Sequence, residues 1–157
     1  MAPPGIISTI DDWMHPVAFH FCVLVDGTRT SFSDVKGIDF SLETIPVSSG
    51  GDSFTKYYLP KGKKYNDLIL SRGILKTGDD FFKWCNDTLS SPPKKDYIKL
   101  KNLLVALLDE SGQPIKTWIF KQAYPVQWSL SDFGAMKNEV VVETVHIRYN
   151  SFFIQQG

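Results

Sequence analysis

Three histidines and one pair of glutamates are the first residues of this chain to consider for catalysis or metal binding. His15, His20 and His146 have no Cys or carboxylate at the spacing of a metal-ligand motif. Glu139 and Glu143 are four positions apart on a predicted strand, so they share one of its faces and could act as a general acid and base. A solvated or interface face is the favoured interpretation of that pair. The pattern therefore predicts no metal, no cofactor and no catalytic residue.

The segment 48–53, Ser-Ser-Gly-Gly-Asp-Ser, has the small residues of a phosphate-binding loop. Such a loop requires Gly-x-x-x-x-Gly-Lys-Ser/Thr leading into a helix, because backbone amides and the lysine together hold the phosphates. This segment has neither the lysine nor a helical pattern after it, and the chain has no Gly-x-Ser-x-Gly nucleophile elbow. A flexible loop is favoured here. An enzyme would need a convergent polar pocket, and the sequence does not predict one.

A compact basic patch at 61–64, Lys-Gly-Lys-Lys, lies next to three tyrosines, Tyr57, Tyr58 and Tyr65. Basic side chains interleaved with aromatic rings can bind single-stranded nucleic acid, so a small β-barrel binding module remains an alternative with salt-dependent affinity. The chain as a whole has 17 basic and 17 acidic residues and a formal net charge of zero. Because phosphate binding needs several convergent cations, this balance favours a solvated loop or a subunit contact.

The length of 157 residues predicts a single domain, residues 1–157, with a substantial core. The aromatic content of 13% favours strands. No apolar run approaches the length of a membrane span, and the first residues lack the pattern of a signal peptide, which predicts synthesis in the cytoplasm without a membrane anchor. Cys22 and Cys85 lie far apart within apolar patterns, so both are expected to be buried, reduced thiols.

The first half of the chain is predicted to form an irregular arm, a hairpin and a long projecting loop. Residues 1–16 hold three prolines and no clean periodicity, and residues 17–25 then alternate as a half-buried strand does. Asp26-Gly27 is a hairpin turn signal, and a second extended segment follows at 30–44. Residues 46–64 are predicted to form a long projecting loop, interrupted by a short aromatic piece. Loops of that length inside a compact domain are usually functional or disordered.

One segment predicts a helix. Thr77 is a candidate N-cap with an acidic residue three positions later, which is related to a capping box. Apolar or small residues then recur at three- and four-residue spacing on one face, namely Phe81, Trp84, Cys85, Thr88 and Leu89. Ser-Ser-Pro-Pro at 90–93 ends it.

The last third of the chain is predicted to be strands. Residues 97–108 and 114–122 form a hairpin around the turn at 109–112, and residues 138–152 form one long β-branched strand without Gly or Pro. A strand of that length needs partners along its whole edge. The predicted class is mainly β: an antiparallel β-sandwich or barrel with one inserted α-helix.

In order along the chain, these segments resemble the tube proteins of contractile phage tails. Phe-Ser-Asp-Val-Lys-Gly-Ile at 32–38 resembles the family's Phe-Ser-Glu-Val-x-Gly-Leu, and Glu43 with Gly50-Gly51 resembles its Glu-x-x-x-Gly-Gly region. The segments that match its later motifs are 59–62, 64–65, 68–73, 81–84, 107–112, Trp118, Ala123 with Pro125, and Asn138-Glu139 with Glu143. The similarity covers residues 17–153. Lys61, which interrupts a Leu-Pro-Gly motif, and the residues 148–151 depart from the family pattern.

The resemblance implies a structural subunit that forms six-membered rings, which stack into a hollow tube inside a contractile sheath and conduct DNA or protein cargo. It implies sheath and baseplate partners and a place in a virion tail or an extracellular injection particle. A tube-initiating paralogue at the baseplate is the alternative within the family. The candidate inter-subunit loop comprises Ser48, Gly50, Gly51, Asp52, Lys61, Lys63 and Lys64. The candidate edge or interface strand carries Glu139, Glu143 and Arg148.

Overall fold

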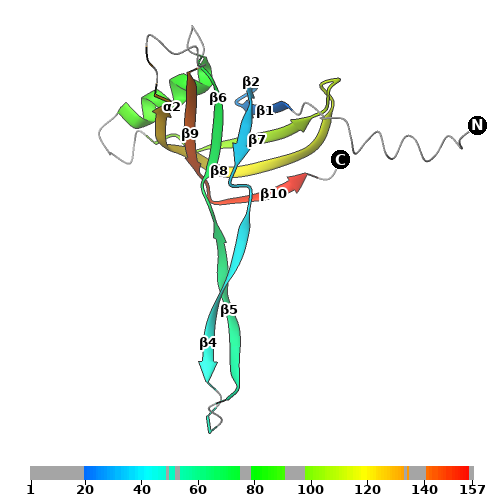
Figure 1. Ribbon diagram of the computed structural model, residues 1–157, viewed down its shortest axis with the longest axis vertical. Coiled ribbons are helices and arrows are strands. Elements are labelled where there is room, and N and C mark those ends of the chain that lie inside the picture. The colour runs from blue at the N-terminus through cyan, green and yellow to red at the C-terminus, as the bar shows by residue number, and fades with distance from the viewer. Residues whose placement is uncertain are drawn as a thin grey trace, which may run out of the picture.

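The computed structural model describes residues 20–48, 50–51, 54–74, 79–90, 98–132, 134 and 141–155. Ten strands and one helix lie in these ranges (Figure 1). Their bounds are β1 His20–Val25, β2 Thr28–Phe32, β3 Asp34–Lys36, β4 Phe40–Ser48, β5 Lys56–Tyr65, β6 Leu68–Gly73, α2 Asp80–Ser90, β7 Lys101–Leu108, β8 Pro114–Leu130, β9 Val142–Arg148 and β10 Ser151–Gln155. No helix among these residues is long and apolar enough to cross a membrane. The irregular arm predicted at residues 1–16 lies outside the described residues.

Eight strands form one antiparallel sheet in the order β2-β1-β7-β8-β9-β6-β3, and β10 pairs with β8 off this path. The two ends of the order, β2 and β3, are separated in the chain by Ser33 alone. The backbone N–H of Ser33 donates to the carbonyl oxygen of Ser71 in β6, at 2.9 Å. The sheet therefore curls back on itself in the manner of a barrel. The predicted class, mainly antiparallel β with one inserted helix, is confirmed.

β8 is the strand that joins the two halves of this sheet. Over its 17 residues the first part lies between β7 and β10, and the second part pairs with β9. The sequence predicted this strand only to residue 122, whereas β8 continues to Leu130. Pro125 lies at a register irregularity of the β8–β9 pair, where the missing N–H is tolerated. At Gln122 the backbone has a φ of 52°, and its N–H is bound by Asn102 Oδ1 at 3.2 Å.

The prediction of one unbroken strand at 138–152 is wrong. Residues 135–140 lie outside the described residues, and the remainder forms two strands, β9 and β10, on either side of Tyr149 and Asn150. β9 pairs with the second part of β8, whereas β10 pairs with its first part, so the chain must turn between them. The N–H of Asn150 donates to the carbonyl oxygen of Lys121 at 2.9 Å and holds that turn.

The core lies between the inner face of the curled sheet and one face of α2. Its fully buried side chains come from β1, β6, β7, β8, β9 and the helix: Val23, Leu68, Leu70, Phe81, Cys85, Leu103, Val105, Phe120, Val145 and Ile147. In α2, Phe81, Trp84 and Cys85 are buried as predicted, whereas Leu89 is 38% exposed and lies outside the core.

The cap of the helix differs from the prediction. Thr77 lies outside the described residues, and Asp79 Oδ1 accepts the N–H of Phe82 at 2.9 Å. Asp79 therefore caps α2, since this bond satisfies one of the four free N–H groups at a helix start. Cys22 and Cys85 are free and buried, as predicted. Burial raises the pKa of Cys85 to about 12, which leaves its thiol unreactive.

Candidate functional site

The only predicted acid–base residue that the structure describes, Glu143, is part of a buried ionic network. Arg72 Nε donates to Glu143 Oε2 at 3.0 Å, and the two terminal guanidinium nitrogens of Arg72 donate to Asp79 at 2.7 and 3.0 Å. Trp128 Nε1 donates to the second oxygen of Glu143 at 2.8 Å, and Thr30 Oγ1 donates to Asp79 at 3.1 Å. Both oxygens of Glu143 are thereby engaged within the core. This arrangement links β2, β6, β8 and β9 to the start of α2 and leaves no free base for chemistry.

The network also determines the charge of Asp79. Burial by itself would raise the pKa of Asp79, but the hydrogen bonds from Arg72 and from the N–H of Phe82 outweigh burial and lower it to about 2. For Arg72, burial opposes the charged form, and the bonds to Asp79 and Glu143 raise the pKa. The pair is therefore ionised at neutral pH and acts as a structural ion pair.

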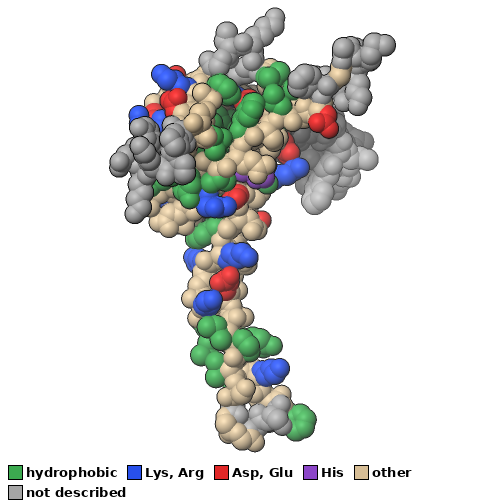
Figure 2. Space-filling model, turned by 90° about the vertical axis from the view of Figure 1, so that its left-hand side faces the viewer, with side chains coloured by type: hydrophobic (Ala, Val, Ile, Leu, Met, Phe, Trp, Pro, Cys, Tyr) green, Lys and Arg blue, Asp and Glu red, His purple; other side chains and the backbone are tan. Residues whose placement is uncertain are grey.

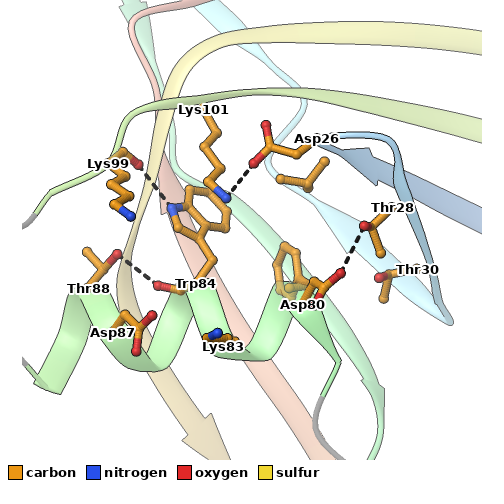
Figure 3. A pocket seen from close by; sticks show the side chains of 12 residues that line it. Asp26, Thr28, Thr30, Asp80, Lys83, Trp84, Asp87, Thr88, Lys99 and Lys101 are labelled. Carbon is orange, nitrogen blue, oxygen red and sulfur yellow. Dashed lines mark hydrogen bonds and ion pairs between the residues drawn. The ribbon is translucent and has the colours of Figure 1, made fainter.

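A polar cavity of about 520 Å³ lies between α2, the β1–β2 turn and the start of β7 (Figure 3). Its side chains bond with one another: Lys101 Nζ lies 2.5 Å from Asp26, and Thr28 Oγ1 donates to Asp80 at 3.1 Å. The indole N–H of Trp84 donates to the carbonyl oxygen of Lys99 at 3.0 Å. Within the described residues no group of three His, Cys, Asp or Glu side chains could hold a metal ion. These contacts hold the start of α2 against β2 and the β1–β2 turn against β7.

The projecting segment predicted at 46–64 is a β-hairpin and not a loop. β4 and β5 pair from Phe40 opposite Tyr65 to Ser48 opposite Lys56, with a bulge at Glu43 and Thr44. The hairpin extends away from the body as a two-stranded ribbon (Figure 1). All nine residues of β4 and nine of the ten in β5 are exposed. An isolated two-stranded hairpin is marginally stable in water, so the outer part of this ribbon has little packing of its own to stabilise it.

The distal half of the hairpin carries a patch of exposed apolar side chains. Ile45 lies opposite Leu59, and Val47 lies opposite Tyr57, so all four point to one face of the ribbon. Their exposed fractions are 47%, 54%, 40% and 58% respectively. Figure 2 shows hydrophobic side chains gathered on this part of the ribbon, with most charged side chains nearer the body and a basic side chain also close to the tip. We call Ile45, Val47, Tyr57 and Leu59 the hairpin patch, and such a patch on a small protein marks an interaction surface.

An aromatic cluster fixes the hairpin to the body. The ring of Phe40 lies 5.9 Å from that of Phe152, and Tyr65 lies 5.7 Å from Tyr149 and 5.5 Å from Phe152. Gly37, just before the hairpin, has a φ of 84°, and a Cβ there would lie 2.0 Å from the carbonyl oxygen of Asp67. Only glycine allows this close approach. The direction in which the hairpin leaves the body is therefore determined by packing at its base.

The predicted loop residues that the structure describes lie along this hairpin, some near its tip and some nearer the body. Ser48 ends β4, Gly50 and Gly51 are at the tip, and Asp52 lies outside the described residues. The three lysines belong to β5 nearer the body: Lys61 at the bulge, Lys63 opposite Leu42 and Lys64 opposite Ser41. The patch itself was missed by sequence reasoning. The alternation at 45, 47, 57 and 59 was a signal for it, but Pro46, Pro60 and the intervening glycines favoured a loop.

The predicted edge strand is not an edge. β9 lies between β6 and β8, so both of its sides are paired, and the prediction that Glu143 belongs to an edge or solvated face is wrong. The Glu143 carboxylate is buried in the core, where it forms an ion pair with the buried guanidinium of Arg72. Glu139 lies outside the described residues. Arg148 is exposed at the end of β9, where its guanidinium binds Asp67 at 3.1 and 3.2 Å. Among the described strands, β10 pairs with β8 alone.

The fold and the hairpin can be compared with known proteins. A family model described as T4-like virus tail tube protein gp19 matches residues 17–153. The chain belongs to this tail tube family. The predicted resemblance is thereby confirmed, and this family consists of structural tube proteins. No curated protein matches the sequence.

Solved structures of tube proteins share the fold. A chain of the PVC sheath–tube complex, an extracellular contractile injection system in its extended state, is 20% identical with a TM-score of 0.76, over 98% of this chain and 99% of that one. A chain of the anti-feeding prophage baseplate is 21% identical with a TM-score of 0.73, over 99% and 97%. Hcp1 from Flavobacterium johnsoniae is 16% identical with a TM-score of 0.58, over 88% and 96%. The tail tube fold therefore spans nearly the whole chain.

Proposed function

We propose that this tail tube protein is the building block of the inner tube of a contractile tail or injection machine. Six copies form a ring, rings stack into a hollow tube, and DNA or protein cargo passes through the lumen. In this proposal the whole chain acts as one domain with a structural role and has no enzymatic activity. Its partners are further copies of itself together with sheath and baseplate proteins, and it functions in a virion tail or an assembled extracellular particle after synthesis in the cytoplasm.

The observation that carries this proposal is the hairpin patch. Four large apolar side chains on an extended ribbon remain 40–58% exposed in the part of the chain that the structure describes. Burial of apolar side chains contributes about 25 cal/mol per Å², so a neighbouring copy that covers the ribbon is favoured. Among the described strands β10 pairs on one side only, and this edge is a second surface, because an unpaired strand edge is stabilised when a neighbouring strand pairs with it. The hairpin patch suits contact between rings, and the edge of β10 suits contact within a ring.

One observation supports an alternative place for this protein, at the baseplate end of the tube. The similar solved chains come both from a sheath–tube complex and from a baseplate. A tube-initiating subunit at the baseplate would have the same fold, with one face adapted to a baseplate partner. The two positions differ in whether the purified protein assembles by itself.

The test is negative-stain electron microscopy of the purified protein over a concentration series. We expect six-fold rings and stacked tubes for the natural sequence, and only isolated rings or monomers for Val47→Glu with Tyr57→Glu. Ser111→Glu, which adds a charge in the exposed β7–β8 turn, is the control and should assemble normally. Monomers at all concentrations, which become rings only with baseplate proteins, would indicate the initiating position. Tubes formed equally well by the hairpin variant would contradict the role of the hairpin patch.

A further inference from the structure

The curled sheet has two outward sides, and they differ in chemistry. In Figure 1, β6 and β9 run upright, in line with the hairpin, whereas β7, β10 and the first part of β8 run across them. The two parts of the sheet therefore face different directions. We call the outward side of β3, β6, β9 and the second part of β8 the polar face. The outward side of β1, β7, the first part of β8 and β10 is the apolar face.

The apolar face carries one row of large hydrophobic side chains across four strands. The row consists of Leu24, Leu104, Ile119 and Phe153, which lie opposite one another in the strand register. Their neighbours in the chain, such as Val23 and Phe120, are fully buried, so the row points away from the core. Leu24 is 36% and Phe153 is 47% exposed. Assembly that covers this row is favoured, because it removes apolar surface from water.

The polar face carries two cross-strand rows of mostly hydroxyl, amide and charged side chains. The rows are Asp34, Ser71, Thr144 and Ser129, and Lys36, Ile69, His146 and Gln127. The hydroxyl groups of Ser71 and Thr144 form a hydrogen bond at 3.1 Å. On this side, the described residues of the four strands include no exposed large hydrophobic side chain. Because polar groups lose favourable hydration on burial, this face gains little from being covered.

The charges of the polar face are balanced in pairs. Lys36 Nζ lies 3.4 Å from Asp34, and the guanidinium of Arg148 binds Asp67 at 3.1 and 3.2 Å. Within the described parts of these strands, no further Lys, Arg, Asp or Glu points outward. The polar face therefore has no net charge when His146 is neutral. Exposed pairs of this kind add little stability, so their main effect is on the local electrostatic potential.

The helix lies on the opposite side of these strands. Phe82 of α2 packs against Trp128, with ring centroids 6.1 Å apart, and Trp128 alternates along β8 with the outward-pointing Gln127 and Ser129. A ring that encloses a channel can therefore direct either α2 or the polar face inward. The polar face is the better wall, because its short hydroxyl side chains leave the channel clear whereas a helix would narrow it.

We infer that the polar face is the wall of the channel, and that its balanced charges let cargo of either sign pass without electrostatic retention. This inference rests on the proposed tube function and identifies the side of each copy that the cargo meets. A wall with a strong net charge would concentrate counter-ions and hold cargo of opposite sign. Here Lys36 and Arg148 are each neutralised by a carboxylate of the same face.

Cysteine labelling of assembled tubes tests which side faces the channel. Gln127→Cys places a thiol on the polar face at an exposed position. Six equal bodies in a ring enclose a hole about as wide as one of them, about 40 Å for a domain of this size, so a gold particle of about 100 Å cannot enter. Tubes of this variant should react with N-ethylmaleimide and not with maleimide-coated gold particles. Unassembled Gln127→Cys, the control, should react with both reagents.

The natural sequence gives the labelling background, because Cys22 and Cys85 are buried. Circular dichroism verifies the fold of the variant, and electron microscopy verifies its tubes before labelling. Gold particles bound along the tubes would place the polar face on the outer surface, and tubes that react with neither reagent would place it between copies. Either result overturns the inference and leaves the tube function in place. Absence of tubes for the natural sequence would instead contradict the proposed function, and the inference with it.

A second measurement tests the balance of charge. Tubes of Gln127→Cys are treated with two thiosulfonate reagents of similar size, one cationic and one anionic. The ratio of the two reaction rates should lie within about twofold of the ratio for a small free thiol. Lys36→Gln in the same background leaves Asp34 unpaired, and should raise the ratio in favour of the cation by about threefold or more.

Lys116→Gln is the matched control for this measurement. It removes the same charge from the first part of β8, outside the polar face, so the ratio of rates should not change. A strong preference for one reagent in tubes that carry only Gln127→Cys would contradict the charge-balanced wall. An unchanged ratio in Lys36→Gln would show that the Lys36–Asp34 pair does not face the channel.

Discussion

Arg72 and Glu143 are 71 positions apart in the chain, yet their side chains form a buried ion pair, with Nε 3.0 Å from Oε2 and each side chain 6% exposed. The guanidinium also lies over the rings of Phe32 and Phe81, at 5.1 and 5.7 Å. Arg72 is therefore held by two carboxylates and two aromatic rings at the point where β6, β9, β2 and α2 meet. Because Asp79 caps α2, Arg72 ties the start of the helix to the sheet.

Replacement of Arg72 by Met should destabilise the protein by about 3–5 kcal/mol, because Glu143 then remains buried without a cation. Urea unfolding measures the free energy of unfolding directly. Arg148→Met is the matched control: its partner Asp67 is also a carboxylate, but the Arg148 side chain is 58% exposed. An exposed pair contributes about 0–1 kcal/mol, so this control should change little. Equal losses in the two variants would contradict the structural role of the buried pair.

Stability should fall in acid between about pH 4 and pH 2 because of Asp79. Its pKa in the folded protein is about 2, below the ordinary value of 3.8, so the folded state favours the ionised carboxylate. The associated stabilisation is present above the unfolded pKa and is lost as the pH falls through the folded pKa. Unfolding free energies measured from pH 6 to pH 2 for the natural sequence and for Asp79→Asn should converge toward the acid end. A difference that stays constant with pH would show that Asp79 does not contribute through ionisation.

Tyr149→Phe should leave stability unchanged or raise it by about 1 kcal/mol. The Tyr149 hydroxyl is buried at the base of the hairpin, and it is the one buried side-chain polar atom among the described residues without a hydrogen-bond partner. A buried hydroxyl that loses its hydration and gains no hydrogen bond costs about 1–3 kcal/mol of stability, and phenylalanine avoids that cost. Thermal unfolding reports the change, with Tyr58→Phe as a control because Tyr58 is 65% exposed. A clear loss of stability would indicate that the hydroxyl has a partner.

Trp84→Ala should destabilise by about 3–5 kcal/mol through the cavity it leaves in the core. Trp84 is 4% exposed, its ring meets Phe81 at 5.8 Å, and its N–H bonds to Lys99. Leu89→Ala on the same helix should cost much less, since Leu89 is 38% exposed and lies outside the core. Chemical denaturation of both variants gives the comparison, and similar losses would contradict the division of α2 into a core face and an outer face.

Deletion of residues 48–52 should leave a folded protomer that assembles poorly. Of these residues, Ser48 ends β4 and Gly50 and Gly51 lie at the tip of the hairpin, far from the core along the ribbon (Figure 1). The deletion shortens the ribbon and disturbs the Val47–Tyr57 pair next to the tip. Circular dichroism should show an intact fold, whereas sedimentation should show loss of large assemblies. Loss of the fold would mean that the tip contributes to the core.

The sequence alone determined the mainly β class, the buried face of the inserted helix and the family. These depend on local signals, such as the alternation of strands, the three- and four-residue spacing of Phe81, Trp84 and Cys85, and the order of the family motifs. The burial of Glu143 could not be predicted in this way, because its partner Arg72 is distant in the chain and the two meet only when β6 pairs with β9.

The tertiary structure also decided where strands continue and where they break. β8 passes through Pro125 because an irregularity in its pairing accepts a proline. β9 ends at Arg148, and after the turn at Asn150 the chain pairs as β10 with the first part of β8. The segment 46–64 carries loop-forming residues, yet cross-strand pairing from Phe40 to Tyr65 makes it part of a ribbon whose distal half lies beyond the core. A β-strand is completed by partners remote in sequence, so local residues predict that strands exist, and only the folded chain determines their ends and exposed faces.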